Sequence, residues 1–450
     1  MRRRERGDKR IQDYDPLYAF LRYYVDLALH LSYRTVRYVG REKIPQDGAV
    51  IYAPNHTNGL MDAMVILALD QKPKVFVARA DIFKNPKIAK ILTFLKILPI
   101  MRMRDGMDEV RKNNETIERA VDVLRDRVPF CIFPEGTHQT KYSSLPLSKG
   151  IFRIAFQAQE LMPDMPLYIV PVGIRYGSFF RFRSTIRVQI GDPINVGKFI
   201  TDRGDMTSSE QMNAMKDELD ERMKRSIFYI PNDENYDATY EICAATVKSQ
   251  VRHLRNDKEL GHLKGVDAHF AANNMTVKHL GYLKEANPEL AADILSLGNR
   301  AFELRTADRI SMSSVSVKYP ILSRVLKCLI FIVLLPYLLP VSFLSLPVLG
   351  ICRYLFTKLK DYAFRNSVRY AVNLVIWPLL MIIYSIIAYV ALPWQWALPV
   401  TLLLLPAPIV AHELARLLRI FISDVKLLCN KELRQCYREI RNKMFSNPTL

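Results

Sequence analysis

The chain has 450 residues, and its 64 Lys and Arg against 45 Asp and Glu give a formal net charge of +19. Half of the residues are hydrophobic, which excludes a disordered, collagen-like or low-complexity protein. The six cysteines are scattered, with no Cys-x-x-Cys pair and no histidine at zinc-ligand spacing. We therefore expect neither a disulfide framework nor a metal site, and a reducing, cytosolic setting is favoured. A basic excess of this size indicates nucleic acid, a membrane surface or anionic small molecules as partners.

The first 44 residues are basic and aromatic. Their charged start is not followed by the apolar core and the small-residue cleavage site of a signal peptide. From Tyr14 to Tyr38, tyrosines and arginines are mixed with leucines, which predicts a helix lying at a bilayer surface. An ordinary amphipathic helix packed on the domain explains the same pattern equally well.

Residues 45–200 alternate between strand-like and helix-like patterns. Strands are expected at Ala49–Ala53, Lys74–Ala78, Phe130–Phe133, Tyr168–Val172 and Ile186–Ile190. Helical spacing of apolar residues appears between Val110 and Leu124, and again from Ser148, as the N-cap, to Leu161. This alternation predicts an α/β domain in which helices flank a mostly parallel sheet. Residues 201–315 show a charged helical pattern without a strand signal.

Two long uncharged runs follow. Between Lys327 and Arg353 lie 25 residues without Asp, Glu, Lys or Arg, and between Arg369 and Glu413 lie 43. About 20 apolar residues cross a bilayer as a helix, so the second run is long enough for two crossings. A Pro-Trp-Gln-Trp sequence at 393–396 suits the turn between them. The alternative is a buried helix pair within a large soluble domain.

The first uncharged run is interrupted by Pro336, Pro340 and Pro347. Basic residues flank both runs on every side, and positive flanks stay on the cytoplasmic side, which requires an even number of passes. We therefore expect the first run to be a bent, re-entrant or hairpin segment and the second to be a helical hairpin. The expected organisation is an interfacial helix at 1–44, the α/β domain at 45–200, a charged helical region at 201–315, a transmembrane region at 316–420 and a basic cytoplasmic tail at 421–450.

Polar residues gather where two predicted strands end. His56 follows the first strand, and Asp62 falls in the first turns of the next helix. A carboxylate that holds an imidazole fixes its tautomer, so the free nitrogen can take a proton from an alcohol. The alternative is a helix-capping turn with a surface histidine.

The second group is Phe-Pro-Glu-Gly-Thr-His at 133–138, again after a strand. Glu135 offers an acceptor for a polyol hydroxyl, and Gly136 an unhindered backbone amide. Arg102 and Arg104 can form the forked contact that a phosphate prefers, and Lys149 adds charge at a helix start, although a solvated surface explains lone basic residues as well.

Together these motifs resemble the glycerol-phosphate acyltransferase superfamily. The His56…Asp62 block, the arginine block, the Glu135 block and the Ile-Val-Pro-Val-Gly block at 169–173 occur in the order of the family. The resemblance, over roughly residues 45–200, implies that His56 is the general base and Asp62 its orienting partner. It implies that Arg102 binds phosphate and that Glu135, Gly136 and Thr137 belong to the acyl-acceptor site.

The resemblance further implies direct acyl transfer from a thioester on coenzyme A or acyl carrier protein to glycerol-3-phosphate or its 1-acyl derivative, without metal or organic cofactor. No Ser or Cys stands in a nucleophile elbow. Two features depart from the common pattern: five residues instead of four separate His56 from Asp62, as in the glycerol-3-phosphate/dihydroxyacetone-phosphate branch, and Lys96 stands where the arginine block usually has Gly.

Other functions fit the sequence less closely. One is an acyltransferase that acts on an amino-acid-derived lyso-lipid, which the phosphate-type arginines disfavour. Another is a non-enzymatic lipid-binding protein of the same fold. Nucleic-acid binding has no supporting motif. The leading expectation is a multi-pass enzyme of the cell membrane, in phospholipid biosynthesis, with its acyltransferase domain on the cytoplasmic side.

Overall fold

The structure is a computed structural model, and it describes residues 10–100, 113–315, 320–359 and 361–445. The chain divides into two compact units. The first comprises Met1–Ile227 with the short segment Lys360–Tyr370, and the second comprises Phe228–Leu359 with Ala371–Leu450.

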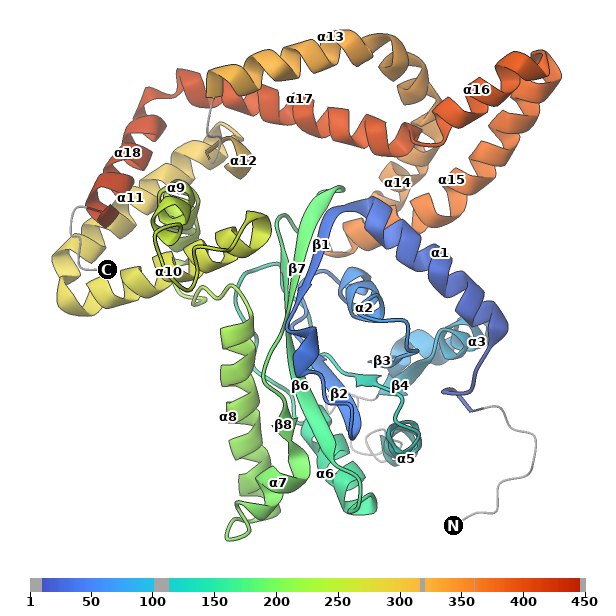
Figure 1. Cartoon of the computed structure of the whole chain (residues 1–450), viewed down its shortest axis with the longest axis vertical. Helices are drawn as coiled ribbons and strands as arrows, with labels where there is room; N and C mark the ends of the chain where they lie inside the picture. Colours follow the sequence, from blue (N-terminus) through green and yellow to red (C-terminus); the bar gives the residue numbers. More distant parts are fainter. Residues whose placement is uncertain (1–9, 101–112, 316–319, 360, 446–450) are drawn as a thin grey trace. The chain divides into compact units, whose positions relative to one another are not determined.

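The first unit is built on one mixed sheet (Figure 1). Its strands are β1 (Tyr33–Val39), β2 (Ala49–Pro54), β3 (Val75–Arg79), β4 (Ile97–Ile100), β5 (Phe130–Cys131), β6 (Leu167–Tyr176), β7 (Ser184–Ile190) and β8 (Ile194–Asn195). They lie in the order β1-β7-β6-β2-β5-β3-β4, with β8 paired to β6. Most pairs are parallel, and only β6 pairs antiparallel, with β7 and β8. The predicted α/β fold with a mostly parallel sheet is confirmed.

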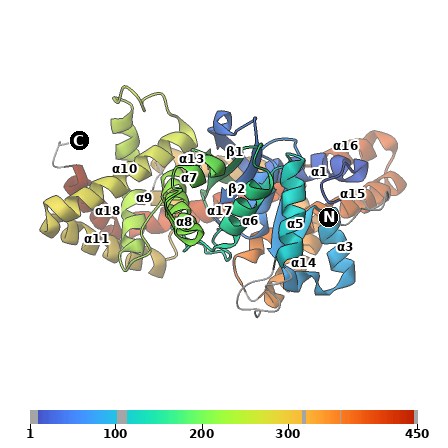
Figure 2. The same cartoon turned by 90° about the horizontal axis from the view of Figure 1, so that it is seen from below.

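Helices cover this sheet. They are α1 (Pro16–Ser32), α2 (Leu60–Leu67), α3 (Pro86–Phe94), α5 (Asn113–Arg125), α6 (Gly150–Leu161), α7 (Val196–Thr201) and α8 (Ser208–Ser226), with short 3-10 turns at Arg41–Lys43 and Ala80–Lys84. Alternate residues of the central strands, such as Ile51 and Ile169, form one apolar core with α5, α6, α7 and α8. Helices α5, α6 and α8 lie side by side (Figure 2).

The N-terminal helix is shorter than predicted. It begins after Asp15, which caps it, and ends at Ser32, so the residues up to Val39 form β1 instead. β1 pairs in parallel with β7, about 150 positions later in the chain, and this pairing overrides the local helical pattern. Helix α6 also differs in detail, because it begins at Gly150 and Ser148 does not cap it.

The second unit is helical in the part of the chain that the structure describes. Its helices are α9 (Tyr236–Leu254), α10 (Gly265–Ala286), α11 (Pro288–Ala307), α12 (Met312–Val315), α13 (Pro320–Leu344), α14 (Leu346–Lys358), α16 (Trp394–Leu404), α17 (Ala407–Cys429) and α18 (Lys431–Phe445). Helix α15 (Phe364–Ala391) begins in the first unit and continues into the second.

The described part of the predicted C-terminal tail, up to Phe445, is helical and packed. Leu433, Tyr437 and Ile440 of α18 join one apolar core with residues of α9 and α11. Inside it, the buried Glu241 accepts bonds from Arg305 Nε, at 2.8 and 2.9 Å, and from the Tyr437 hydroxyl. Helices α9, α11 and α18 therefore form one body, whereas α8, at the start of the charged helical region, belongs to the core of the first unit.

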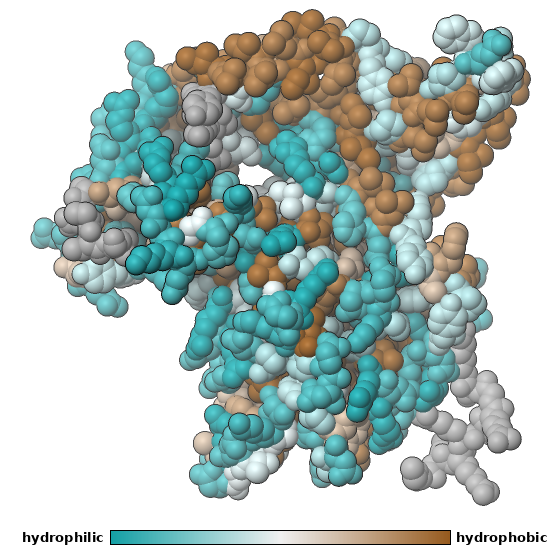
Figure 3. All heavy atoms as spheres, in the orientation of Figure 1, coloured by the Kyte–Doolittle hydropathy of each residue, from teal (hydrophilic) through white to brown (hydrophobic). Residues whose placement is uncertain are grey.

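Among the described residues, two helices are long and apolar enough to cross a membrane, Ile321–Leu344 and Phe364–Ala391. Helices α16 and α17, which meet at a 48° bend, give a third candidate if they act as one span. Figure 3 shows hydrophobic residues gathered over this part of the chain on the face drawn. The turn expected at 392–396 is present, because α15 ends at Ala391 and α16 begins at Trp394.

The prolines of the first apolar run lie at two kinds of position, inside a helix and at a helix start. Pro336 and Pro340 lie inside α13, which continues to Leu344 and bends toward this end (Figure 1). A proline removes one backbone hydrogen bond but need not end an apolar helix. The break comes at Ser345, where Pro347 opens α14. The number of membrane passes stays a prediction.

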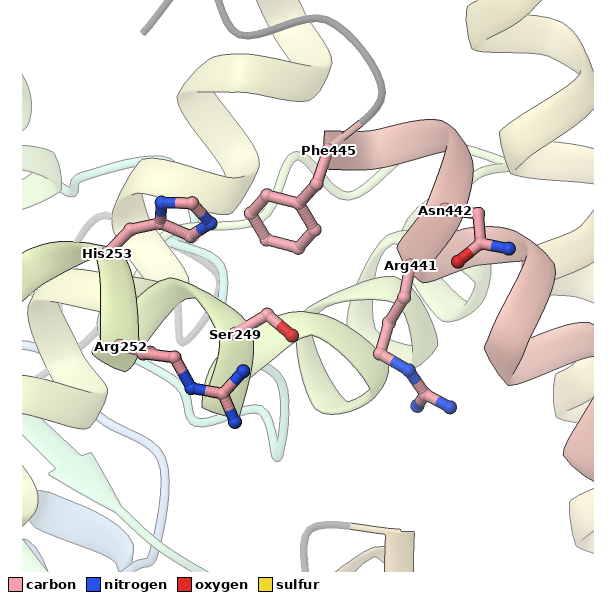
Figure 4. Close-up of a pocket in the computed structure, with 6 residues that line it drawn as sticks. All are labelled: Ser249, Arg252, His253, Arg441, Asn442 and Phe445. Atoms are coloured by element: carbon pink, nitrogen blue, oxygen red, sulfur yellow. The ribbon is translucent and has the colours of Figure 1, made fainter.

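A pocket of about 460 Å³ lies in the second unit between α9 and α18 (Figure 4). Arg252 and Arg441 extend on either side of Ser249, and the rings of His253 and Phe445 stack with centroids 5.0 Å apart. None of the predicted site residues lines it.

Candidate active site

His56 and Asp62 lie at the carboxyl edge of the sheet. β2 ends at Pro54, the chain turns through residues 55–59, and Asp62 falls in the first turn of α2. His56 Nδ1 lies 2.8 Å from Asp62 Oδ2. Because a carboxylate only accepts hydrogen bonds, Nδ1 carries the proton, and Nε2 is left with a lone pair. The two residues that the sequence analysis paired are thus in contact.

The turn itself holds the Asp62 carboxylate. Oδ2 also accepts the backbone N–H groups of Thr57, at 2.8 Å, and Asn58, at 2.7 Å. Gly59 makes this tight turn possible, because its φ of +56° lies in the left-handed region that other residues avoid. The alternative for this sequence, a helix-capping turn with a surface histidine, is not what forms: α2 begins after Gly59 without a side-chain cap bond, and the turn positions the Asp62 carboxylate against a largely buried His56.

Tyr176 is a member of the site that the sequence analysis missed. It ends β6, and its hydroxyl donates to Asp62 Oδ1 at 2.7 Å. Tyr176 is fully buried, and burial beside the Asp62 charge raises its pKa well above the ordinary value, so it remains a donor. Both oxygens of Asp62 are therefore hydrogen-bonded, and the carboxylate has one fixed orientation.

Glu135 reaches the same place from the neighbouring strand. β2 and β5 are parallel partners, so their carboxyl ends meet at one edge. Glu135 Oε2 accepts the backbone N–H of His56 at 3.4 Å, and the His56 ring stacks on Phe133, with centroids 4.2 Å apart.

The Glu135 carboxyl is almost completely buried, and burial raises its pKa to about 8. Its Oε1 has no hydrogen-bond partner among the described residues. A buried oxygen without a partner is costly, which makes Oε1 the natural acceptor for a substrate hydroxyl.

Comparisons with known proteins agree with this geometry. Residues 35–175 match the acyltransferase family model. Glycerol-3-phosphate O-acyltransferase 2 of Saccharomyces cerevisiae is 31% identical over 135 residues, which cover 30% of this chain and 18% of that protein. A probable 1-acyl-sn-glycerol-3-phosphate acyltransferase of Mycoplasma pneumoniae is 26% identical over 184 residues, or 40% of this chain and 64% of that protein.

Residues 35–175 of this chain therefore form an acyltransferase domain, which is similar in sequence to proteins named as glycerol-3-phosphate and 1-acyl-sn-glycerol-3-phosphate acyltransferases. The chain spans less than two thirds of the length of each of these relatives. Among solved structures, the 1-acyl-sn-glycerophosphate acyltransferase PlsC from Thermotoga maritima aligns with a TM-score of 0.34 and 21% identity, over 46% of this chain and 77% of that chain.

The other two residues of the predicted acceptor site, Gly136 and Thr137, follow Glu135 in the turn after β5. The backbone N–H of Gly136, expected to be free, donates to Phe133 O at 3.1 Å in the turn, where Gly136 has a φ of +63°. Thr137 is exposed beside it. Of this block in the acyltransferase domain, only Glu135 directs an unsatisfied polar atom inward.

The arginine block, predicted to bind phosphate, follows β4 in the sequence. Arg102 and Arg104 lie outside the described residues, directly after β4. Lys96, just before β4, has a φ of +60°, which explains why glycine is usual there. Its Nζ donates to Ile11 O at 2.6 Å and to Asp13 O at 2.8 Å, so this lysine ties the N-terminal segment to the acyltransferase domain.

The remaining candidates have structural positions. Lys149 is exposed and precedes α6 without capping it. Pro171, in the fourth block, pairs in register with Ala53 inside the sheet. Burial raises the pKa of the Cys131 thiol, so this cysteine is a poor nucleophile. Among the described residues, no three His, Cys, Asp or Glu side chains are grouped as metal ligands.

Proposed function

We propose that the protein transfers a fatty acyl group from an acyl thioester to a hydroxyl of glycerol-3-phosphate or 1-acyl-glycerol-3-phosphate. The observation that carries the proposal is the His56–Asp62 pair beside the unpartnered Glu135 Oε1, at one edge of an acyltransferase-family sheet. The names of the relatives support the acceptor class.

His56 acts as the general base in this reaction. Its side chain is 19% exposed, so an acceptor can reach Nε2 while Nδ1–H stays bonded to Asp62. As the hydroxyl attacks the thioester carbonyl, its proton moves to Nε2, and the positive charge that forms on the ring is stabilised by Asp62. The C–S bond then breaks, the proton passes from Nε2 to the leaving sulfur, and the ester and the free thiol leave while His56 returns to its neutral form. The step needs no covalent enzyme intermediate and no cofactor.

Glu135 orients the acceptor. At neutral pH its carboxyl is largely protonated, because burial raises its pKa to about 8. A neutral carboxyl both donates and accepts, so it can hold a polyol hydroxyl without placing a second negative charge beside a phosphate. Arg102 is the proposed phosphate ligand.

We place this reaction at the cytoplasmic face of the cell membrane. Two or three candidate membrane-spanning helices and the basic residues that flank them support this location. A bilayer gives a long acyl chain a medium in which its apolar surface is not exposed to water.

The test is an acyl-transfer assay on the full chain in lipid vesicles. Labelled acyl-CoA or acyl carrier protein would be offered with glycerol-3-phosphate, dihydroxyacetone phosphate and lysophosphatidate in turn. We expect turnover with at least one phosphorylated acceptor, and product analysis identifies the acceptor and the donor. Absence of turnover with every pair would refute the proposal.

Arg102→Ala tests the phosphate contact, with Arg125→Ala in α5 as an exposed control of equal charge. A lost arginine–phosphate contact should raise KM for the acceptor roughly tenfold or more, while the control stays at the wild-type value. An unchanged KM in Arg102→Ala would favour an acceptor without phosphate.

A further inference from the structure

A short segment that is remote in sequence lies against the catalytic turn. This segment, Asp361–Tyr370, links α14 to α15 and forms the first two turns of α15, and below it is called the linker segment. A Cβ atom placed on Gly59, in the His56–Asp62 turn, would lie 3.3 Å from the Phe364 ring. The linker segment therefore packs against the turn that holds His56 and Asp62.

Hydrogen bonds to the acyltransferase domain fix the linker segment. Asn366 is buried, and its Nδ2 donates to Tyr33 Oη at 3.0 Å and to Phe179 O at 3.2 Å. Arg369 donates to Phe180 O at 3.0 Å, and the Tyr370 hydroxyl donates to Val25 O at 2.9 Å. These bonds end on separate parts of the domain, so they define a single position for the linker segment.

Asp361 binds a second histidine of the site. His138 Nε2 lies 2.8 Å from Asp361 Oδ2, while Asp361 Oδ1 accepts the backbone N–H of Ala363, also at 2.8 Å. Phe364 meets the His138 ring edge to face, with centroids 5.1 Å apart. Hydrogen bonding to the backbone and to His138 lowers the pKa of Asp361, so it is a carboxylate at neutral pH.

His138 in turn contacts the proposed base. The rings of His138 and His56 meet at 70°, with centroids 5.4 Å apart, and Phe133 stacks on His56. The imidazole of His56 is thus located by three contacts: Asp62 at Nδ1, Phe133 and His138. Of these three neighbours, only His138 is itself hydrogen-bonded to a residue outside the α/β domain at residues 45–200, namely Asp361.

We propose that Asp361 and His138 are positioning residues of the active site, through which the linker segment holds the His56 ring in its working orientation. This inference rests on the proposed function and extends it. It makes the active site depend on the chain that leads into a candidate membrane-spanning helix, α15. A fragment that ends before the linker segment would then lack one of the contacts that orient His56.

A double-mutant cycle in the full chain tests the inference. Asp361→Ala and His138→Ala should each lower kcat about tenfold, with little change in acceptor KM, since they disturb the orientation of His56. The double variant should lose no more than the poorer single variant, because both substitutions break one connection. Asp192→Ala, which removes an exposed ion pair with Lys43, is the matched control and should retain wild-type kcat.

A second readout does not depend on activity. Diethyl pyrocarbonate modifies accessible imidazoles, and peptide mass spectrometry gives the rate for each histidine. We expect the labelling rate of His138 to rise several-fold in Asp361→Ala, relative to the exposed His30 as internal reference. Wild-type and Asp192→Ala proteins should show the same slow labelling of His138.

The outcomes separate the two proposals. Wild-type kcat in Asp361→Ala, losses that multiply in the double variant, or a change confined to KM would overturn the positioning role. If the wild-type protein transfers acyl groups to no acceptor, the proposed function fails, and labelling alone decides whether Asp361 holds His138. Unchanged labelling in Asp361→Ala would then overturn this inference too.

Discussion

Asp62 is held more firmly than its role as a partner of one histidine requires. Two backbone amides and the Tyr176 hydroxyl bind it in addition to His56. Charge-assisted bonds of this kind fix a carboxylate in one orientation. The turn at 55–59 and the end of β6 hold Asp62 in place, and Asp62 in turn orients His56.

Tyr176→Phe tests this support with the smallest change available. It removes the bond to Oδ1 and leaves the three bonds to Oδ2, so we expect kcat to fall about tenfold with acceptor KM nearly unchanged. Tyr142→Phe, which removes a buried hydroxyl bond to the Tyr176 backbone, is the control for a general packing effect. Equal losses in both variants would show that Tyr176 has no special role.

The buried Glu135 should give the domain a characteristic pH dependence. Its native pKa, about 8, lies above the ordinary value of 4.5, so the folded state holds this proton more tightly than the unfolded state does. Its stabilising contribution is complete below about pH 4.5 and is lost as the pH rises toward 8, at up to about 1.4 kcal/mol per pH unit.

Glu135→Gln removes this titration. The unfolding midpoint of the wild-type protein, measured relative to Glu135→Gln in the same detergent, should fall between pH 5 and pH 8. If the unfolding midpoints of the two proteins change in the same way over this pH range, the raised pKa of Glu135 is contradicted.

At the residue scale, the sequence predicts those site residues that are close together in the chain or directly follow a recognisable strand. His56 and Asp62 are six positions apart, and Glu135 follows a recognisable strand, so all three were found. Tyr176 and Asp361 were not, because they reach the site only through the pairing of β6 with β2 and through a segment more than 200 positions later. No local pattern records such contacts.

Helix α1 combines the two alternatives that its sequence left open. Arg22 and Leu29 are buried, and Arg22 donates to the carbonyl oxygens of Leu67 and Asp70, so one side packs on the domain. The opposite side exposes large apolar residues, with Phe20 72% exposed and Tyr23 66%. An exposed stripe of aromatic and apolar residues on a helix is typical of contact with a membrane interface.

A photocrosslinker at position 20 tests this interpretation in the full chain in vesicles. Benzoylphenylalanine in place of Phe20 should crosslink to lipid, whereas the same probe in place of the exposed Asp192 should not. Equal lipid crosslinking at the two positions would show that the exposed side of α1 does not face the bilayer.

Elements were predictable where the periodicity is local and strong. All five expected strands are present, because each is a mostly apolar run or, at Ile186–Ile190, an alternation of apolar and polar residues. β1 was mistaken for helix because Arg34 and Arg37 interrupt its apolar residues, and β4, an apolar run of only four residues, was missed. β8 has only two residues and exists through its pairing with β6.

At the scale of the whole molecule, distant segments join to form the second unit. Helix α18 packs with α9 and α11, although more than 120 residues, including both apolar runs, lie between α11 and α18 in sequence. By sequence, these stretches fall in different regions because their compositions differ, and their packing in one core is seen only in the structure. The apolar helices are joined in turn by a buried ion pair between Lys327 of α13 and Asp424 of α17.

Breaking this pair should destabilise the helical unit. Lys327→Met leaves a buried carboxylate without its partner, at a cost of about 3–5 kcal/mol, whereas Lys327→Met with Asp424→Leu should recover most of the unfolding midpoint. Arg300→Ala, which breaks an exposed pair with Glu432, should leave the midpoint unchanged. If the double variant is as unstable as the single variant, the instability does not come from the unpaired Asp424 carboxylate.

The central claim is that His56 is the base of an acyl transfer. Its most direct test is the initial rate of acyl transfer to a phosphorylated glycerol acceptor by the full chain in vesicles, for wild type and His56→Ala at equal protein levels. We predict that the substitution lowers kcat by about 10²–10⁴-fold while the unfolding midpoint is retained. A folded His56→Ala protein that transfers acyl groups at the wild-type rate would contradict the account.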